Sequence, residues 1–262
     1  MEILNEKTYF STEMNKKYMS ASQFKDFLKC PACAMAKLNG EWEQEKTTSL
    51  LVGSYIDANY EGKLDEFKEN NPELFKKDGT LKSDYVKAEE IITRLQKDEF
   101  FSKYMNGEKQ VIMTGQIEDV PIKIKIDSYH KDKCIVDLKI VKDMQPIWNG
   151  KEKENFVEYW GYDIQMAIYQ EIVRQNTGKK LPTFLAVATK EATTDFAILS
   201  IDNDRLDEVM ETIIKPMIRI FNEMKNGNNN IEITRCEKCD YCKSTKKLTH
   251  IIDYKYLGKE DE

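Results

Sequence analysis

The stretch PIKIKIDSYHKDKCIVDLKI, residues 121–140, decides the fold. Its isoleucines alternate with lysines in the first part, and this period of two predicts a β-strand over 121–127. A second apolar run predicts a strand over 134–140, and the polar segment between the two runs predicts a short turn. We therefore expect two neighbouring strands of a meander, preceded by a third strand over 110–115.

The same stretch carries a pattern of charged residues. Residues two apart on a strand share a face, so Asp137 and Lys139 point the same way. If the two strands pair, Asp127 lies beside Asp137. Two carboxylates and a lysine suit Mg²⁺ or Mn²⁺, which polarises a phosphodiester and activates a water. The lysine then orients that water or offsets the developing charge. From spacing alone, an exposed strand without catalytic function is the better fit to these residues.

Two helical segments carry further polar residues. Gly53-Ser54-Tyr55-Ile56-Asp57 places a carboxylate on a predicted helix, where it can supply a third ligand to the metal. Gln165 and Tyr169 stand at i and i+4 of another helix, so their polar ends share one face and can hold a phosphate or a nucleotide. Taken alone, Asp57 also fits a solvated helix position, and the Gln/Tyr pair also fits an ordinary amphipathic helix.

The remaining pattern predicts helices and strands in the order helices, strands, helix, strands, helix. A capping box of Ser20 and Gln23 begins the first helix, which Pro31 ends. Gly178 ends the helix that carries Gln165, and Pro216 should kink the last helix, which Gly227 stops. Helices are expected at 47–61, 83–97 and 158–176, a turn-rich segment at 62–82, and strands at 183–189 and 196–201. We predict a mixed α/β fold in which helices flank a central, mostly antiparallel-edged sheet.

Composition restricts the class of protein. A chain of 262 residues with 40% hydrophobic residues can bury a sizeable core. The net charge of −6 argues against a protein that coats nucleic acid by bulk electrostatics, although a local groove can still be basic. Two histidines exclude a multi-histidine metal site. No apolar run is long enough for a membrane helix or a signal peptide, so we expect a cytoplasmic protein without a membrane partner.

Six cysteines form two groups and one isolated residue. Cys236, Cys239 and Cys242 form two overlapping C-x-x-C steps, a spacing that lets thiolates surround one metal centre. A fourth ligand can come from Cys30 or Cys33, and a closed four-cysteine site holds zinc or an iron–sulfur cluster. The alternative is a set of reduced thiols without a metal.

Taken in order, these motifs resemble a known nuclease superfamily. The series is Ser-x-x-x-Phe followed by Cys-Pro, Gly-x-x-x-Asp, Ile-Asp, Asp-Leu-Lys, Gln-x-x-x-Tyr and the C-terminal cysteines. It resembles the PD-(D/E)XK superfamily over about residues 20–245, with a restriction-endonuclease-like core. Within that superfamily it is most similar to the RecB-like branch, and there to phage and prophage exonucleases of the exodeoxyribonuclease VIII (RecE-like) kind.

The resemblance implies a role for each matching residue. Asp127 and Asp137 bind Mg²⁺ or Mn²⁺, the Leu138 carbonyl is a further ligand, and Lys139 is the catalytic lysine. Asp57 stands where most relatives have a metal-binding histidine, which affects the choice of metal.

The resemblance also implies functions for the helix and the cysteines. Gln165 and Tyr169 match the helix that contacts DNA or steadies the site. The four-cysteine set resembles the iron–sulfur clamp of AddB-type and CRISPR-associated exonucleases; it comprises Cys30, Cys236, Cys239 and Cys242. The spacing between the three C-terminal cysteines is tighter here than in those enzymes.

We therefore expect a metal-dependent DNA exonuclease of phage or prophage recombination in a bacterial host cell. Residues 1–18 are expected to be a flexible arm, 19–250 the nuclease domain with its cysteine clamp, and 251–262 a tail. A single-strand annealing protein as partner and a homo-oligomer are further expectations from the resemblance. Two alternatives stay open: a catalytically weakened DNA-binding or assembly module stabilised by the four-cysteine metal site, and a metal-stabilised protein-interaction domain.

Overall fold

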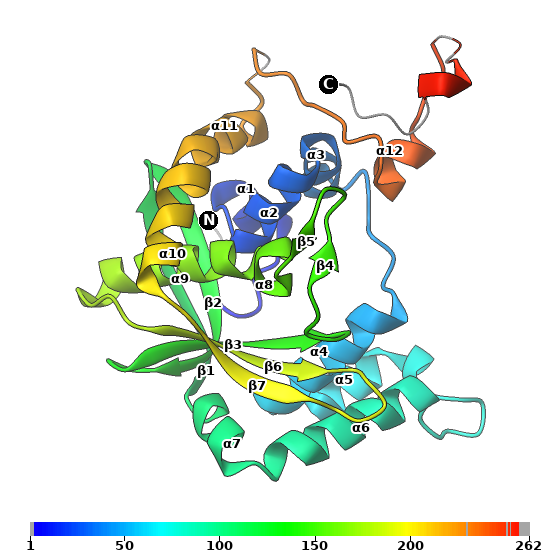
Figure 1. The fold of residues 1–262 in the computed structure, drawn as a ribbon, viewed down its shortest axis with the longest axis vertical. Coiled ribbons are helices and arrows are strands. Elements are labelled where there is room, and N and C mark those ends of the chain that lie inside the picture. Colours follow the sequence, from blue (N-terminus) through cyan, green and yellow to red (C-terminus); the bar gives the residue numbers. More distant parts are fainter. Residues whose placement is uncertain (1–2, 229, 250, 252, 257–262) are drawn as a thin grey trace.

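The computed structural model describes residues 3–228, 230–249, 251 and 253–256. Its helices are α1 (Thr12–Lys17), α2 (Ala21–Lys29), α3 (Pro31–Asn39), α4 (Thr48–Glu61), α5 (Leu64–Asn70), α6 (Ser83–Gln96), α7 (Glu99–Met105), α8 (Phe156–Tyr159), α9 (Tyr162–Thr177), α10 (Asn203–Val209), α11 (Lys215–Lys225) and α12 (Asp240–Ser244). Its strands are β1 (Glu108–Ile117), β2 (Val120–His130), β3 (Cys134–Val141), β4 (Ile147–Trp148), β5 (Lys153–Glu154), β6 (Thr183–Thr189) and β7 (Phe196–Ile201). Figure 1 shows their arrangement.

The main sheet has the strand order β1-β2-β3-β6-β7. β1, β2 and β3 form the expected antiparallel meander, whereas β3 and β6 run parallel and β7 is antiparallel to β6. A parallel pair needs a long crossover, which here contains α8 and α9. The predicted mixed α/β fold with helices around a central sheet is therefore confirmed.

Helices cover both faces of this sheet (Figure 1). On one face, α2, α9, α10 and α11 bury an apolar cluster that includes Phe24 and Phe221. On the other face, α4, α6 and α7 bury a second cluster that includes Phe101. β3 contributes side chains to both clusters, because Ile135 faces the first cluster and Val136 faces the second. Each fully buried side chain of this kind contributes roughly 1.5–3 kcal/mol, so the two clusters hold the sheet between its helices.

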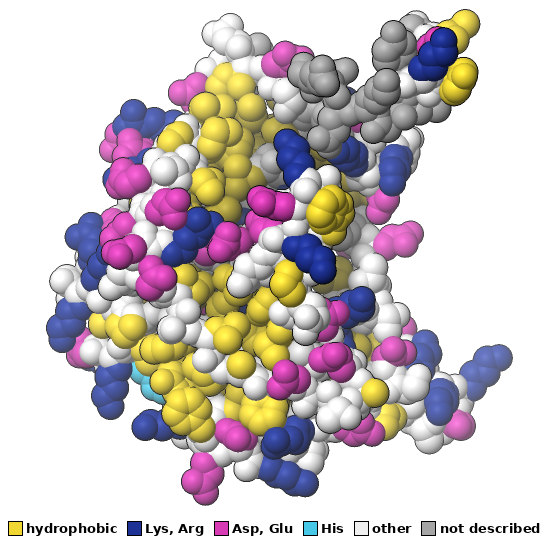
Figure 2. Space-filling view, in the orientation of Figure 1, with side chains coloured by type: hydrophobic (Ala, Val, Ile, Leu, Met, Phe, Trp, Pro, Cys, Tyr) yellow, Lys and Arg dark blue, Asp and Glu magenta, His cyan; other side chains and the backbone are white. Residues whose placement is uncertain are grey.

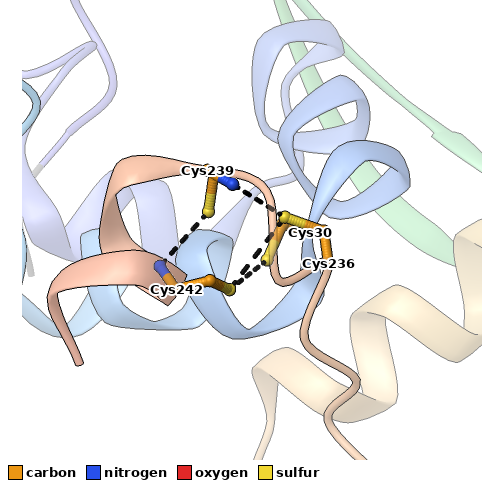
Figure 3. Close-up of side chains that lie close together, drawn as sticks. All are labelled: Cys30, Cys236, Cys239 and Cys242. Carbon is orange, nitrogen blue, oxygen red and sulfur yellow. Dashed lines mark hydrogen bonds between the residues drawn. The ribbon is translucent and has the colours of Figure 1, made fainter. Parts of the chain in front are cut away.

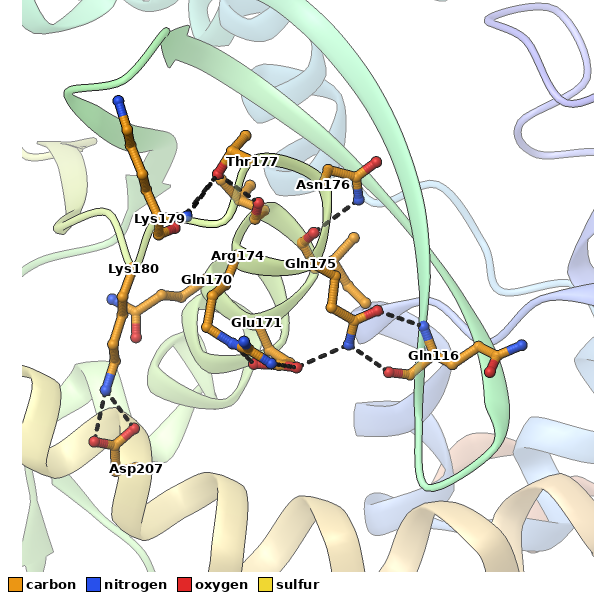
Figure 4. Close-up of polar contacts among 12 residues, drawn as sticks. Gln116, Gln170, Glu171, Arg174, Gln175, Asn176, Thr177, Lys179, Lys180 and Asp207 are labelled. Atoms are coloured by element: carbon orange, nitrogen blue, oxygen red, sulfur yellow. Dashed lines mark hydrogen bonds and ion pairs between the residues drawn. The ribbon is translucent and has the colours of Figure 1, made fainter.

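The carboxyl end of α9 is tied to two neighbouring elements (Figure 4). The side chain of Gln175 accepts the amide of Gln116 at 3.0 Å and donates to its carbonyl at 2.6 Å. Gly115 permits this approach, because a Cβ there would collide with Gln175. Just beyond the helix, Lys180 pairs with Asp207 of α10 at 2.6 Å. These contacts fix the position of α9 against the sheet.

Several local features match the sequence, and others differ for identifiable reasons. The capping box of Ser20 and Gln23 is present at the start of α2. Pro31 not only ends that helix but also begins α3, since a proline at the first helical position loses no hydrogen bond. The predicted turn-rich segment 62–82 contains α5. The last helix is interrupted by a π-helical turn, Met210–Ile214, immediately before α11, which contains Pro216 near its start.

The described part of the N-terminal segment packs against the sheet, unlike the flexible arm expected over residues 1–18. Tyr9 and Met14 are buried, and α1 lies within this segment. Lys123 of β2 is 1% exposed and donates to the Tyr9 carbonyl and, at 2.7 Å, to Asn15. A buried ammonium needs such acceptors, which explains why the segment is held in place.

The other end of the chain is only partly described. The expected boundary at 250 and residues 252 and 257–262 of the expected tail lie outside the described residues. No helix in the described part of the chain has the length and apolar character needed to cross a membrane.

Candidate active site

Asp127 lies where β2 separates from β3 and where its pairing with β1 is interrupted at a single position. The β2–β3 ladder pairs His130 with Cys134 and ends at Ser128 with Val136, one position before Asp127 would meet Asp137. The Leu138 amide instead donates to Oδ2 of Asp127 at 2.9 Å. A side chain thus replaces a ladder hydrogen bond, and the two strands separate at the carboxylates.

A distortion in β1 completes this opening. The β1–β2 ladder skips the position of Gln110 and Asp127, and Gln110 has a φ of 53°, in the left-handed region that few residues other than glycine adopt. Its side-chain amide donates to Oδ1 of Asp127 at 3.3 Å. The Asp127 carboxylate is therefore held by a hydrogen bond from each side.

A cavity of about 440 Å³ lies at this opening. All seven residues predicted for the nuclease site line it: Asp57 of α4, Asp127 of β2, Asp137, Leu138 and Lys139 of β3, and Gln165 and Tyr169 of α9. Two helices far apart in the sequence, α4 and α9, thus converge with the β2–β3 pair on one cavity. This convergence contradicts the interpretation in which these side chains are unrelated surface groups.

Asp137 is at the centre of the contacts around the cavity. It is 2% exposed and forms an ion pair with Lys139, which shares its face of β3 as the period of two predicts. The Gln165 amide donates to Oδ1 of Asp137 at 2.6 Å. The Tyr169 hydroxyl does not reach a carboxylate; it donates to the backbone carbonyl of Lys125 on β2 at 2.9 Å. Gln165 and Tyr169 therefore join α9 to both strands of the site.

Burial and mutual repulsion raise the pKa values of Asp127 and Asp57. Desolvation, followed by repulsion from Asp137, raises the pKa of Asp127 to about 7. Desolvation and then repulsion from Asp127 raise the pKa of Asp57 well above its usual range. For Lys139, desolvation lowers the pKa, but attraction to Asp137 and Asp127 outweighs it and the net shift is upward. Lys139 therefore remains an ammonium, while the carboxylates hold negative charge at a cost that a cation would relieve.

The donor set fits a hard divalent cation. Three carboxylates and the Leu138 backbone offer only oxygen, which Mg²⁺ and Mn²⁺ prefer. Their oxygens lie too far apart for all three carboxylates to surround a point as tightly as the cysteines described below do. Mg²⁺ keeps several waters in proteins, so the carboxylates do not all need to contact one ion directly.

Sequence reasoning missed several residues that line this cavity or lie behind its wall. Lys25 of α2 donates to Oε1 of Gln165 at 3.4 Å and thereby extends the Gln165–Asp137 contact to a second cation. Desolvation and then repulsion from Lys139 lower the pKa of Lys25 to about 8. Tyr162 lies beneath both ammonium groups. Further missed residues line the wall: Tyr9, Phe10, Ser22, Ser54, Glu61, Phe67, Gln110 and Lys125.

Four cysteines form a separate cluster (Figure 3). The sulfurs of Cys30, Cys236, Cys239 and Cys242 all lie within 4.8 Å of one another, and among the described residues no other set of three or more His, Cys, Asp or Glu ligand atoms is so compact. Two Sγ–Sγ distances are 3.5 Å (Cys30 to Cys242) and 4.0 Å (Cys236 to Cys242). Cys33 is not a member of this set.

The backbone around the cluster suits thiolate ligands. The amide of Cys239 donates to the Cys236 sulfur at 3.3 Å, and the amide of Cys242 donates to the Cys239 sulfur at 3.5 Å. Although desolvation opposes it, backbone hydrogen bonds from Lys238 and Cys239 lower the pKa of Cys236 to about 7. Cys30 lies between α2 and α3, so a metal here would fasten the end of α2 to residues 236–242.

Comparisons with known proteins agree with the fold and the site. Residues 20–245 match the family model of the PDDEXK-like domain of unknown function (DUF3799). The chain belongs to this family, and the predicted membership of the PD-(D/E)XK nuclease superfamily is confirmed.

One solved structure is similar to this chain over nearly the whole length of both. A protein from Eubacterium rectale described as a "putative exonuclease" is 45% identical, and the alignment covers 98% of this chain and 99% of that one with a TM-score of 0.93. A protein described as SSO0001 is 13% identical over 73% of this chain and 84% of its own, but its TM-score of 0.26 carries no argument. No curated protein matches significantly. The fold and the relative together support a nuclease.

Proposed function

We propose that this protein is a metal-dependent DNA exonuclease that hydrolyses phosphodiester bonds. The observation that carries the proposal is the convergence of Asp57, Asp127, Asp137 and Lys139 on one cavity. The name of the Eubacterium rectale relative supports exonuclease rather than endonuclease action. The similarity to the RecB-like branch, and to RecE-like enzymes in particular, supports a role in phage or prophage recombination in the bacterial cytoplasm.

Each residue of the site has a proposed task. Asp57, Asp127, Asp137 and the Leu138 carbonyl would hold Mg²⁺ or Mn²⁺, which supplies a Lewis acid and an activated water. Lys139 stays protonated beside Asp137 and offsets the negative charge that develops on the phosphate.

The supporting residues fix the geometry. Gln165 holds Oδ1 of Asp137, and Tyr169 holds the backbone of β2 two residues before Asp127. Because both side chains come from one helix, they keep the two strand carboxylates in a fixed relation.

The test of exonuclease action compares DNA with and without ends. Linear duplex DNA and a covalently closed circle of the same sequence are incubated with the protein and Mg²⁺ or Mn²⁺. We expect nucleotides to be released from the linear DNA alone. Cleavage of the closed circle at a comparable rate would instead make the protein an endonuclease.

A second function is favoured by two observations. Asp57 stands where the resemblance to RecB-like nucleases leads us to expect a histidine, and the net charge is −6. On the face shown in Figure 2, positive and negative side chains are mixed, and no single basic patch covers that face. A catalytically weakened module that binds DNA or supports assembly, with an annealing protein or further copies of the chain as partners, would have these features. It would bind linear DNA in a mobility-shift assay without cleaving it under either metal ion.

For the cysteine cluster we propose a single zinc ion rather than an iron–sulfur cluster. Four sulfurs at about 2.3 Å from one tetrahedral ion lie roughly 3.8 Å apart. A four-iron cluster takes each thiolate on a different iron, so its ligands stand farther apart. The separations of 3.5 and 4.0 Å favour the single ion. Anaerobically purified protein should contain one zinc per chain and show no visible absorption band, whereas stoichiometric iron would overturn the proposal.

A further inference from the structure

An exposed aromatic side chain stands in the wall of the catalytic cavity. Phe10 is 68% exposed, although it lines the same cavity as Asp127 and Asp137. Isolated exposed apolar residues are common and need no explanation by themselves. Phe10 differs because the ammonium of Lys125, also in the wall, lies 4.9 Å from the centre of its ring. An aromatic face and a cation thus meet beside the carboxylates.

The position of Phe10 is fixed by its neighbours. Tyr9 is buried and packs edge-on against Phe10, with ring centres 5.0 Å apart. The Tyr9 carbonyl accepts a hydrogen bond from the buried Lys123 of β2, and the Phe10 carbonyl accepts one from Asn15 at 3.1 Å. Tyr9 is therefore bonded to the sheet directly, and Phe10 is bonded to Asn15 of α1, which itself accepts a hydrogen bond from Lys123. The aromatic face is prepared before any substrate binds, which lowers the entropic cost of using it.

Lys125 is placed by the same strand that carries the metal site. It lies two residues before Asp127 on β2, about 7 Å along the strand. The Tyr169 hydroxyl bonds to its carbonyl, so the backbone at Lys125 cannot shift independently of α9. A phosphate near Lys125 would therefore adjoin the phosphate at Asp127 and Asp137.

We propose that Phe10 and Lys125 bind one unstacked nucleotide of a single DNA strand next to the phosphate that is cleaved. The inference rests on the proposed nuclease function and names its substrate class. A base stacks on the Phe10 ring, and Lys125 contacts the adjoining phosphate. Such stacking accepts every base, because each base has an aromatic face. A paired base within a duplex cannot offer that face, so the site takes a single strand or an end whose terminal pair has opened.

The test uses a fluorescent base and a variant that does not cleave. An oligothymidylate with one 2-aminopurine is bound to Asp137→Asn protein in the presence of Mg²⁺, and the label is moved along the strand. Stacking quenches 2-aminopurine, so one label position should lose fluorescence on binding. Adding Phe10→Ala should restore that fluorescence and weaken binding on the order of tenfold. Phe10→Trp should keep the quenching, and Lys125→Met should weaken binding without abolishing it.

Phe100→Ala is the matched control. Phe100 is 61% exposed on α7 and is not among the residues that line the cavity, so its removal should change neither fluorescence nor affinity. Quenching that survives Phe10→Ala, or that Phe100→Ala removes equally, would overturn the inference. Failure of the nuclease proposal looks different: the wild-type chain would then cleave no DNA, whatever the fluorescence of the bound strand.

Discussion

The amide of Leu138 donates its hydrogen bond to the carboxylate of Asp127, at 2.9 Å, and not to a neighbouring strand. This contact marks the point where β2 and β3 separate, and the catalytic cavity opens there. An unpaired backbone amide would be costly at such a buried position. Asp127 therefore has a structural task in addition to its proposed binding of metal.

The raised pKa of Asp127 gives a prediction for the protein without added Mg²⁺ or Mn²⁺. Its pKa is about 7 in the folded chain and about 3.9 in an unfolded one. The folded state binds this proton more tightly, so the free energy of unfolding falls as the pH rises from about 4 to 7. Asp127→Asn removes this term and keeps an oxygen acceptor for Leu138. In thermal unfolding, its Tm should exceed that of the wild type by several degrees at pH 8 and by less at pH 5. A Tm difference independent of pH contradicts the shift.

Asp57 should determine the choice of metal. Imidazole suits transition metals better than Mg²⁺, whereas carboxylates accept both Mg²⁺ and Mn²⁺. Asp57→His should therefore keep cleavage with Mn²⁺ and raise the ratio of Mn²⁺ to Mg²⁺ rates severalfold. Asp57→Ala should lower both rates. Parallel cleavage assays over a series of metal concentrations check this, and an unchanged ratio in Asp57→His would show that residue 57 does not contact the ion.

Gln165 should support activity through Asp137. Its side chain bonds to both Asp137 and Lys25, so Gln165→Leu frees a buried carboxylate from its fixed position. Losses of about 10–100-fold are typical when such a supporting partner is removed. We expect a fall of this size in kcat, with a higher Mg²⁺ concentration needed for half-maximal rate.

The control for Gln165 is Gln175→Leu, in the same helix. Gln175 bonds to Gln116 of β1, away from the cavity, so this variant should lose stability while its Mg²⁺ dependence stays that of the wild type. Equal effects of the two variants on the Mg²⁺ dependence would assign Gln165 to packing alone.

Substitution of Cys242 and substitution of Cys33 should affect metal binding at the cysteine cluster differently. Cys242 is fully buried within the four-sulfur set, and Cys33 lies outside it. Cys242→Ser should lose the bound metal and lower the Tm by at least about 5 °C, because the end of α2 is no longer fastened to residues 236–242. Cys33→Ser should keep the metal. Elemental analysis and thermal unfolding of both variants check this, and metal loss in Cys33→Ser would place that thiol in the site.

Much of the fold follows from local patterns. The bounds of β6 agree with the predicted strand over 183–189, because a compact apolar run there has clear polar limits. α5 is not evident from the sequence, since it has only seven residues and only two of them, Leu64 and Phe67, pack partly buried against the core. α3 was not predicted because Pro31 both ends one helix and begins the next. Short elements with weak patterns depend on tertiary contacts that a single sequence does not display.

Some residues of the candidate site can likewise be predicted from local patterns, and others cannot. Asp137 and Lys139 share a face because of strand geometry, which the sequence displays directly. Gln110 reaches the cavity because its backbone adopts a left-handed angle. Phe10 reaches it because the buried Lys123 attaches the neighbouring Tyr9 to the sheet. Neither arrangement has a local signature. The roles of the predicted residues in catalysis remain predictions that the experiments above decide.

Hydrolysis of linear DNA by the wild-type chain and by Asp137→Asn tests the proposed nuclease function most directly. Release of nucleotides is measured with Mg²⁺ and with Mn²⁺, alongside the Tm and the zinc content of both proteins. The proposed function predicts metal-dependent release by the wild type and a loss of at least about a hundredfold in the variant, with Tm and zinc content retained. Equal release by both proteins, or none by the wild type with either metal, would contradict it.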